Sequence, residues 1–272
     1  MTMKILLGAA GVAAGFGMLA LGILAGQPGQ AIAEDKPAAV VASADQAMDR
    51  KQVETIIREY LLANPELLLE VQKALDEKQK EEQRIAQLEV IKEAKDEIFS
   101  SPHDGIVGNP EGKVTIVEFY DYNCGYCKRA QEDMLELVAA DPDLRFVLKE
   151  FPILGPDSQK AHVVAQAFLK LMPEKYADFH NQLISGPGRA GEASAMKLAL
   201  ELGADEAKLR EAMKDPSIQE AFAKTYELAQ RLDITGTPSY VVGNEVVFGA
   251  LGREVLAEKI ELARACQADA TC

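Results

Sequence analysis

The chain has 272 residues, with 29 basic and 43 acidic side chains, a formal net charge of −14 and a pI near 4.8. Because 48% of the residues are hydrophobic, the composition predicts a folded protein with a substantial core and excludes a largely disordered one. The acidic balance argues against nucleic-acid binding and against a polybasic membrane-surface protein, since both need a basic face.

The first 33 residues have the pattern of an export signal. Lys4 is followed by the uncharged stretch 5–26, and Ala31-Ile32-Ala33 supplies a small-x-small cleavage site. We therefore predict a signal peptide over residues 1–33 and a mature protein in the periplasm, where disulfides persist. The uncharged stretch is also long enough to span a bilayer, so an uncleaved membrane anchor is the alternative.

Residues 34–100 are predicted to form a lead-in and a helical arm. Small and polar residues fill 34–50, and residues 51–99 have helical periodicity interrupted at Asn64-Pro65. The arm is too sparsely apolar to make its own core, so it packs on its parent domain, stands in solvent or pairs with copies of itself. The many apolar side chains between Val53 and Leu75 favour a homo-oligomer formed through residues 51–99.

Residues 101–272 are predicted to form one α/β domain. A Pro/Gly-rich boundary ends near Gly112, and the remaining pattern is β-α-β, a block of helices, and then β-β-α. The predicted elements are a strand at 114–120, a helix at 124–140, a strand at 144–151, a helical insertion at about 156–233, a hairpin at 239–248 and a helix at 252–266.

Two cysteines lie where the first of these strands gives way to a helix. Cys124 occupies the first helical turn, where unpaired N–H groups and the helix dipole stabilise a thiolate, the nucleophile of disulfide exchange. Cys127 follows one turn later, so we predict an exposed attacking Cys124 and a buried resolving Cys127. Half of a zinc site is the alternative, but the other cysteines, Cys266 and Cys272, are remote, and no metal is expected.

Glu118 interrupts an otherwise apolar strand six residues before Cys124. A carboxylate in a central strand is costly unless it is used, so we predict that Glu118 handles the proton of the resolving thiol. The alternative is an edge strand with Glu118 in water. Pro238 opens a later strand, where a proline can simply end a loop.

These residues together resemble the DsbA-type thioredoxin-fold oxidoreductases. The resemblance rests on Glu118-Phe-Tyr-Asp-Tyr-Asn-Cys-Gly-Tyr-Cys127 and Gly236-Thr237-Pro238, and it covers residues 105–266. It implies a thioredoxin-like α/β fold with a helical insertion, a buried Glu118, and a cis Pro238 against the cysteine pair. It also implies that Thr237 offers backbone hydrogen bonds to substrate, and we expect Gly125 and Tyr126 to contact substrate as well. No cofactor is expected.

The arm resembles a narrower branch, the suppressor-of-copper-sensitivity protein C (ScsC) group. The similarity lies in residues 57–66 and in Gly108-Asn109-Pro110. Some members of that branch are oligomeric isomerases and others are monomeric. The Gly-Tyr dipeptide is that of the bacterial disulfide isomerase DsbC, and without a histidine between the cysteines Cys124 should belong to a weaker oxidant than DsbA.

The expected function is therefore that of an exported thiol–disulfide oxidoreductase. We expect an isomerase or reductase that acts on unfolded or misoxidised envelope proteins and depends on a membrane redox partner to reduce or reoxidise its site. A net dithiol oxidase of the DsbA type is the alternative. A copper-binding envelope protein is less favoured, although two thiolates can hold Cu(I).

Several other residues have structural interpretations. Cys266 and Cys272 are predicted to form a disulfide that clips the C-terminal tail. The histidines at 103, 162 and 180 are scattered in sequence. His162 and His180 fall in the helical insertion and are interpreted as structural, and Lys128 and Arg129 as solvated helix positions. The tyrosines at 120, 122, 126 and 240 are either ordinary packing or an apolar rim for unfolded substrate.

Overall fold

The computed structural model describes residues 49–269. The predicted signal peptide, nearly all of the lead-in and Cys272 lie outside the described residues. Two compact units divide the chain after Tyr60. Among the described residues, no helix combines the length and the apolar character needed to cross a membrane.

The first unit contains most of helix α1 (Arg50–Ala63). The side chain of Asp49 accepts hydrogen bonds from the backbone N–H groups of Lys51 (2.7 Å) and Gln52 (3.1 Å), as an N-cap residue does. No residue of α1 is buried, and Ile56 and Ile57 each expose 52% of their surface. The helix therefore presents apolar side chains to solvent.

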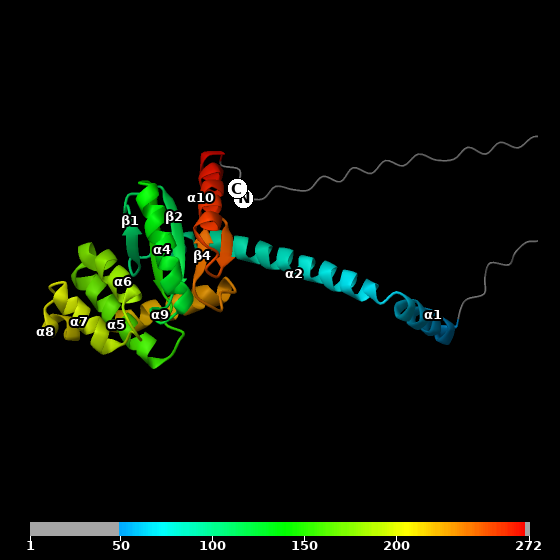
Figure 1. Cartoon of the computed structure of the whole chain (residues 1–272), viewed down its shortest axis with the longest axis horizontal. Helices are drawn as coiled ribbons and strands as arrows, with labels where there is room; N and C mark the ends of the chain where they lie inside the picture. Colours follow the sequence, from blue (N-terminus) through cyan, green and yellow to red (C-terminus); the bar gives the residue numbers. More distant parts are fainter. Residues whose placement is uncertain (1–48, 270–272) are drawn as a thin grey trace, which may run out of the picture. The chain divides into compact units, whose positions relative to one another are not determined.

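The second unit is built on a five-stranded sheet with the order β1-β3-β2-β4-β5 (Figure 1). Strands β2 and β3 are parallel, and the other neighbouring pairs are antiparallel. The strands are β1 (Gly105–Gly108), β2 (Val114–Tyr120), β3 (Leu144–Glu150), β4 (Ser239–Val242) and β5 (Glu245–Phe248).

Helices enclose the sheet, and most of them come from the insertion. They are α2 (Glu66–Glu93), α3 (Lys95–Phe99), α4 (Gly125–Ala140), α5 (Pro156–Leu171), the 3-10 turn η1 (Pro173–Lys175), α6 (Tyr176–Ser185), α7 (Glu192–Glu201), α8 (Glu206–Ala212), α9 (Pro216–Arg231) and α10 (Arg253–Asp269). Breaks near Pro173, Gly186-Pro187-Gly188, Gly203 and Pro216 separate the insertion helices.

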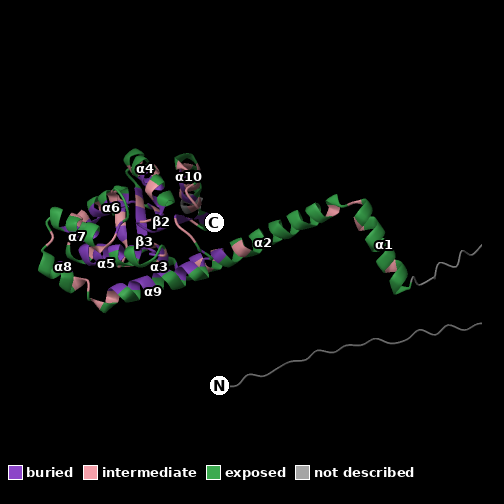
Figure 2. Ribbon diagram, turned by 60° about the horizontal axis from the view of Figure 1, so that its bottom comes forward, coloured by how far each residue is buried: buried purple, intermediate pink, exposed green. Residues whose placement is uncertain are grey.

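Alternate residues of β2 enter two different cores, because successive side chains of a strand point to opposite faces. Ile116 and Tyr120 belong to the core under α4, α10 and the insertion. Val117 and Phe119 belong to a second core with α3, the end of α2 and the last turns of α9. The central strands are therefore covered on both faces, as Figure 2 shows by their burial.

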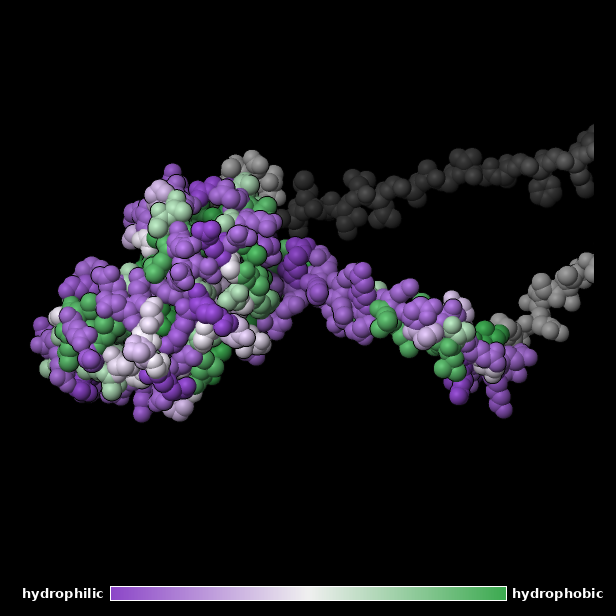
Figure 3. All heavy atoms as spheres, in the orientation of Figure 1, coloured by the Kyte–Doolittle hydropathy of each residue, from purple (hydrophilic) through white to green (hydrophobic). Residues whose placement is uncertain are grey.

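Helix α2 has an exposed part and a buried part within this unit. Leu68, Leu69 and Val71 are 59%, 74% and 56% exposed, and Figure 3 shows hydrophobic side chains gathered on this end of the helix. At the other end Ile91 is buried, and the Gln87 side chain donates to the carbonyl of Leu232 (2.8 Å). The last turns of α2 are therefore part of the domain's second core.

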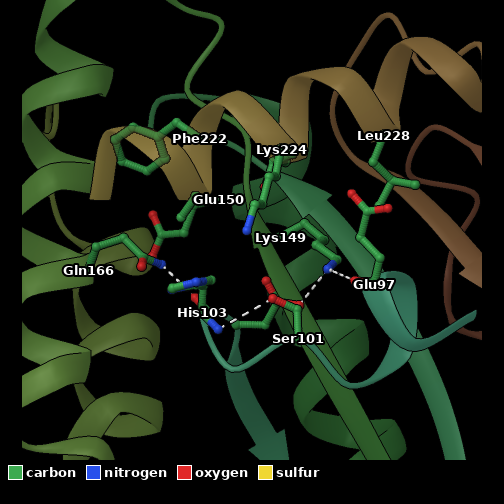
Figure 4. Close-up of a pocket in the computed structure, with 12 residues that line it drawn as sticks. Glu97, Ser101, His103, Lys149, Glu150, Gln166, Phe222, Lys224 and Leu228 are labelled. Atoms are coloured by element: carbon green, nitrogen blue, oxygen red, sulfur yellow. Dashed lines mark hydrogen bonds and ion pairs between the residues drawn. The ribbon is translucent and has the colours of Figure 1, made fainter. Parts of the chain in front are cut away.

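A small polar cavity lies where α3 and the following segment meet β3 (Figure 4). Lys149, itself buried, forms an ion pair with Asp104 (2.6 Å) and donates to the backbone carbonyl of Glu97. The Gln166 side chain donates to the carbonyl of His103 (2.9 Å). These contacts fix residues 97–104 to the sheet.

The sequence missed one strand. Residues 105–108 were expected to be part of a Pro/Gly-rich boundary, but they form β1 and pair with β3 in antiparallel register. The segment is short and both its ends are glycine, so its strand character comes from the β3 edge that it covers rather than from its own residues. The strand at 114–120 and the hairpin strands lie where the sequence predicts them.

Candidate active site

Cys124 and Cys127 lie at the start of α4, directly after the central strand β2. Cys124 is the N-cap residue of α4, with φ −76° and ψ 116°, and both cysteines are free thiols. Cys127 is fully buried, as predicted, but Cys124 is only 6% exposed and is not the exposed thiol that the sequence suggested. The difference arises because Thr237 contacts Cys124 from more than a hundred residues away, while Gly125 and Tyr126 remain exposed.

The environment of Cys124 favours its thiolate. A hydrogen bond from Cys127 is the main cause that lowers the pKa of Cys124 to about 5, against an opposing effect of burial. The Thr237 side chain and the backbone N–H groups of Cys127 and Tyr126 lower this pKa further. All of these donors except Thr237 belong to the first turn of α4, so the start of the helix stabilises the thiolate as predicted.

Cys127 and Glu118 both favour the protonated state. Burial, the hydrogen bond to Cys124 and the charge of Glu118 raise the pKa of Cys127 far above its ordinary value. Glu118 lies in the central strand β2, opposite Tyr240 of β4, and is 2% exposed, so the edge-strand alternative is wrong. Burial, helped by the nearby Cys124 thiolate, raises the pKa of Glu118 to about 8. Its Oε2 atom has no hydrogen-bond partner.

The loop before β4 covers the cysteine pair. The Thr237–Pro238 peptide bond is cis, as the family resemblance implied. The Cys124 Sγ atom lies 3.1 Å from the backbone carbonyl oxygen of Thr237, which accepts a hydrogen bond from the thiol. The sequence-predicted residues Cys124, Cys127 and Thr237 are thus in contact. The charge of Glu118 raises the pKa of Cys127, and the Cys124 thiolate raises the pKa of Glu118.

A second buried carboxylate, Glu150, lies at the end of β3 and has a full set of partners. Its Oε1 atom accepts from the Tyr176 hydroxyl (2.7 Å), and its Oε2 atom accepts from Nδ1 of His162. The Nε2 atom of His162 accepts from the backbone N–H of Tyr122 (3.2 Å), so the ring is the Nδ1–H tautomer. His162 and His180 are both buried, consistent with their structural interpretation.

The residues just before Cys124 are tied to the insertion, a feature that the sequence did not reveal. The Asp121 side chain accepts from the backbone N–H of Asn123 (2.8 Å), the Ser158 hydroxyl (2.8 Å) and the backbone N–H of Leu154 (2.9 Å). The Asn123 side chain accepts from the N–H of Ala190 (2.7 Å) and donates to its carbonyl (2.9 Å). These contacts hold the chain in front of Cys124.

Lys128 is not the solvated residue that the sequence suggested. It is half-buried, and its Nζ atom donates to the backbone carbonyls of Gly186 (3.1 Å) and Gly188 (3.2 Å). The acceptors lie 58 and 60 residues later in the chain, so the sequence around Lys128 does not predict them. Arg129, by contrast, is exposed and lies 4.3 Å from the ring centre of Tyr126.

The remaining sequence-predicted residues divide between packing and surface. Three of the four tyrosines, at positions 120, 122 and 240, are fully buried core residues, whereas Tyr126 is 60% exposed. Only Tyr126 of this group is therefore available as a rim. Cys266 is disulfide-bonded, but its predicted partner Cys272 lies outside the described residues, so that pairing stays a prediction.

Comparisons with known proteins place this site in a family. The sequence model of the DSBA-like thioredoxin domain matches residues 115–261, more than half of the chain, and that of the copper resistance protein ScsC N-terminal domain matches residues 49–82. The chain belongs to the DSBA-like thioredoxin domain family. It is accordingly a thiol–disulfide oxidoreductase of the DsbA and ScsC type.

Individual relatives agree with this assignment. A thioredoxin-like oxidoreductase from Silicibacter pomeroyi is 40% identical, with 62% of this chain and 97% of that one covered and a TM-score of 0.59. Salmonella enterica Typhimurium BcfH is 28% identical, with 79% and 95% covered and a TM-score of 0.68. Disulfide bond formation protein D of Bacillus subtilis is 27% identical over 57% of this chain and 75% of its own length.

Proposed function

We propose that this enzyme isomerises or reduces wrong disulfides in envelope proteins, with Cys124 as the attacking thiolate and Cys127 as the resolving thiol. The observation that carries the proposal is that the pKa values of the two thiols are shifted in opposite directions. A pKa of about 5 makes Cys124 a thiolate at neutral pH, while burial keeps Cys127 protonated. In such a pair Cys124 forms the mixed disulfide with the substrate, and Cys127 stays protonated until it attacks that disulfide.

The reaction has two steps, and only the second needs a proton transfer within the site. The Cys124 thiolate attacks a substrate disulfide, forming a mixed disulfide and expelling one substrate thiolate. To resolve it, Cys127 loses its proton to the Glu118 carboxylate and attacks the Cys124 sulfur, which releases the second substrate thiolate and leaves the Cys124–Cys127 disulfide. If the freed substrate thiolate instead attacks another disulfide of the same substrate, it expels a new substrate thiolate. That thiolate attacks the substrate sulfur of the mixed disulfide, forms a new substrate disulfide and releases the Cys124 thiolate, so the net reaction is isomerisation.

The loop containing the cis proline is proposed to hold the substrate backbone. The carbonyl oxygen of Thr237 lies 3.1 Å from the Cys124 sulfur, so a substrate chain beside Cys124 lies next to the same backbone. The N–H of Gly249 donates to the carbonyl of Pro238 (2.9 Å), which brings the segment after β5 to this loop. Phe248 and Leu251 are 43% and 49% exposed there, and with Gly125 and Tyr126 they offer an apolar surface for an unfolded chain.

The choice of isomerase over net oxidase rests on the arm and on the dipeptide between the cysteines. Self-association through residues 51–99 brings several active sites together, and a paired site favours repeated attack on one substrate. The exposed apolar residues of α1 and of the N-terminal part of α2 support this association. Gly125-Tyr126 provides no histidine to stabilise the thiolate, which favours a milder oxidant.

The envelope setting is also proposed. The predicted signal peptide supports it, as does a solved periplasmic thioredoxin-like protein from Salmonella enterica serovar Typhimurium that is 25% identical to this chain with a TM-score of 0.58. A membrane redox partner would then reset the cysteine pair after each net redox turnover.

Light scattering combined with a scrambled-ribonuclease assay tests the isomerase proposal. Wild-type protein should be oligomeric and should reactivate scrambled ribonuclease, whereas Leu69→Glu should dissociate it and lower reactivation about tenfold without affecting exchange with small thiols. Gln79→Glu, which adds the same charge at an exposed polar position of α2, serves as the matched control. A monomeric wild type that only oxidises reduced ribonuclease would favour the oxidase alternative, and stoichiometric copper without an equilibrating disulfide would favour the copper-binding one.

A further inference from the structure

The cysteine pair is bordered by two loops from different parts of the chain. The loop before β4 contacts Cys124 through Thr237. The second is the loop between α6 and α7, which we call the insertion loop (residues 186–190), and it is bonded to the residues that flank the cysteine pair. Asn123, immediately before Cys124, is bonded to Ala190, and Lys128, one turn after it, is bonded to Gly186 and Gly188. The two residues that bracket the motif therefore hold the same loop.

The insertion loop has little reason to be ordered by itself. Its sequence is Gly-Pro-Gly-Arg-Ala, and Gly188 has φ +75°, a conformation that other residues rarely adopt. Glycine loses the most conformational freedom on folding, so a loop of this composition needs contacts from outside to stay in one conformation. Residues 186 and 190 are partly or fully buried, whereas 187–189 are exposed.

Lys128 supplies two of these contacts. A hydrogen bond from an ammonium group is stronger than one between neutral partners, and Lys128 makes two of them to backbone carbonyls. Its charge is used by the loop and is not among the groups that chiefly lower the pKa of Cys124, which are Cys127, Thr237 and the α4 backbone. Lys128 therefore acts on the position of the loop rather than on the reactivity of the thiol.

The loop is braced at its far end as well. Arg189 donates to the carbonyl of Leu154 (2.7 Å) and pairs with Asp157 (3.0 Å). Asp121, two residues before Asn123, accepts from the N–H of Leu154. The segments around residues 123, 154 and 189 thus form one hydrogen-bonded ring beside Cys124, and Leu154 is 40% exposed on it.

We propose that Asn123 and Lys128 are positioning residues that fix the insertion loop as the second wall of the site that receives a substrate polypeptide. A chain bound at Thr237 would pass Cys124 with the insertion loop on its other side. The wall matters for a polypeptide, which is wide enough to meet both loops, and not for a small thiol or disulfide. This inference rests on the proposed role of Cys124.

The test compares a disulfide-linked peptide with dithiothreitol as partners of full-length protein. Lys128→Met should lower kcat/KM for the peptide about tenfold, through KM rather than kcat, with a much smaller loss for dithiothreitol. Amide hydrogen exchange in residues 186–190 should become faster. Lys128→Arg, which can still donate to both carbonyls, should restore most of the peptide activity.

Lys160→Met is the matched control, because Lys160 is an exposed lysine of α5 in the same insertion. The inference is overturned if Lys128→Met matches Lys160→Met with the peptide, or if peptide and dithiothreitol rates fall equally. Cys124→Ser separates this failure from failure of the proposed function. If that variant still exchanges, the proposed function is wrong, and if it is inactive while Lys128→Met behaves as wild type, only the present inference is wrong.

Discussion

Two buried carboxylates lie on neighbouring strands of the sheet, and their surroundings differ. Glu150 at the end of β3 is bonded to the Tyr176 hydroxyl and to His162. Glu118 in the middle of β2 has an Oε2 atom with no partner, and burial raises its pKa to about 8. A buried carboxylate with a full set of donors stabilises the fold, whereas one left without them is costly to the fold and available to a neighbour. The neighbours of Glu118 are the two cysteines.

The largest expected effect is on stability, at Glu150. Glu150→Ala leaves the Nδ1–H of His162 and the Tyr176 hydroxyl without their acceptor, so the free energy of unfolding should fall by about 3 kcal/mol or more. Urea denaturation of the reduced protein measures this. Glu93→Gln, at an exposed carboxylate 3.9 Å from Arg231, should change stability by only about 0.5 kcal/mol. If both substitutions lower the free energy of unfolding equally, the buried hydrogen bonds of Glu150 contribute no more to stability than an exposed ion pair.

The next effect is on rate, at Glu118. Glu118→Gln keeps the shape of the side chain but cannot accept a proton, so resolution of the mixed disulfide by Cys127 should slow about a hundredfold. Rapid acid quench and mass spectrometry of a single turnover would show the mixed disulfide accumulating. The variant should be no less stable than the wild type, which distinguishes it from Glu150→Ala. A loss of stability with an unchanged resolution rate would assign Glu118 a structural role instead.

The dependence of stability on pH tests the raised pKa of Glu118. Between the ordinary glutamate pKa of 4.5 and about 8, Glu118 is protonated in the folded protein and ionised in the unfolded one. The unfolded state therefore binds fewer protons, and Glu118 makes stability fall as pH rises through this window. Glu118→Gln removes the fall, so its stability relative to wild type should rise by about 1.4 kcal/mol per pH unit. A difference that does not vary with pH would contradict the raised pKa.

The smallest effects concern Cys124, whose pKa is set mainly by other groups. Cys127→Ala removes the first cause of its low pKa, and Thr237→Ala removes a weaker one, so both should raise the pKa of Cys124, the first more than the second. Ultraviolet absorbance of the thiolate across pH follows this directly. Glu118→Gln and Glu150→Ala should each shift it less than Cys127→Ala. The reverse order would mean that the carboxylates control the nucleophile.

The sequence predicted where Glu118 and the cysteine pair lie in the fold because the signals for their positions are local. Glu118 was noticed as a charge in an apolar strand, and Cys124 with Cys127 as a pair at a strand-to-helix junction. The positions of β2 and of the β4–β5 hairpin follow from alternation and from the turn at Gly243-Asn244. The burial of Glu118 confirms that such a break in an apolar pattern points to a buried carboxylate.

What the sequence missed depends on contacts between distant segments. Strand β1 forms because it pairs with β3. Cys124 is covered by Thr237, which lies 113 residues later in the chain. Lys128 has the pattern of a solvent-facing helix position, but the insertion loop supplies it with two carbonyls. Periodicity shows which side of a helix is apolar and does not show which polar groups a neighbouring loop brings to the other side.

If Glu118 takes the proton of Cys127, the rate at which Cys127 resolves the mixed disulfide depends on the ionisation of Glu118. The pH profile of that rate measures this dependence. Resolution by wild-type protein should accelerate as pH rises and Glu118 becomes a carboxylate. Its midpoint should lie no higher than the free enzyme's pKa of about 8, because the Cys124 thiolate that helps burial to raise this pKa is absent from the mixed disulfide. Glu118→Gln should lack this inflection, while attack by Cys124 keeps a midpoint near pH 5 in both proteins. The same inflection in wild type and Glu118→Gln would contradict the account.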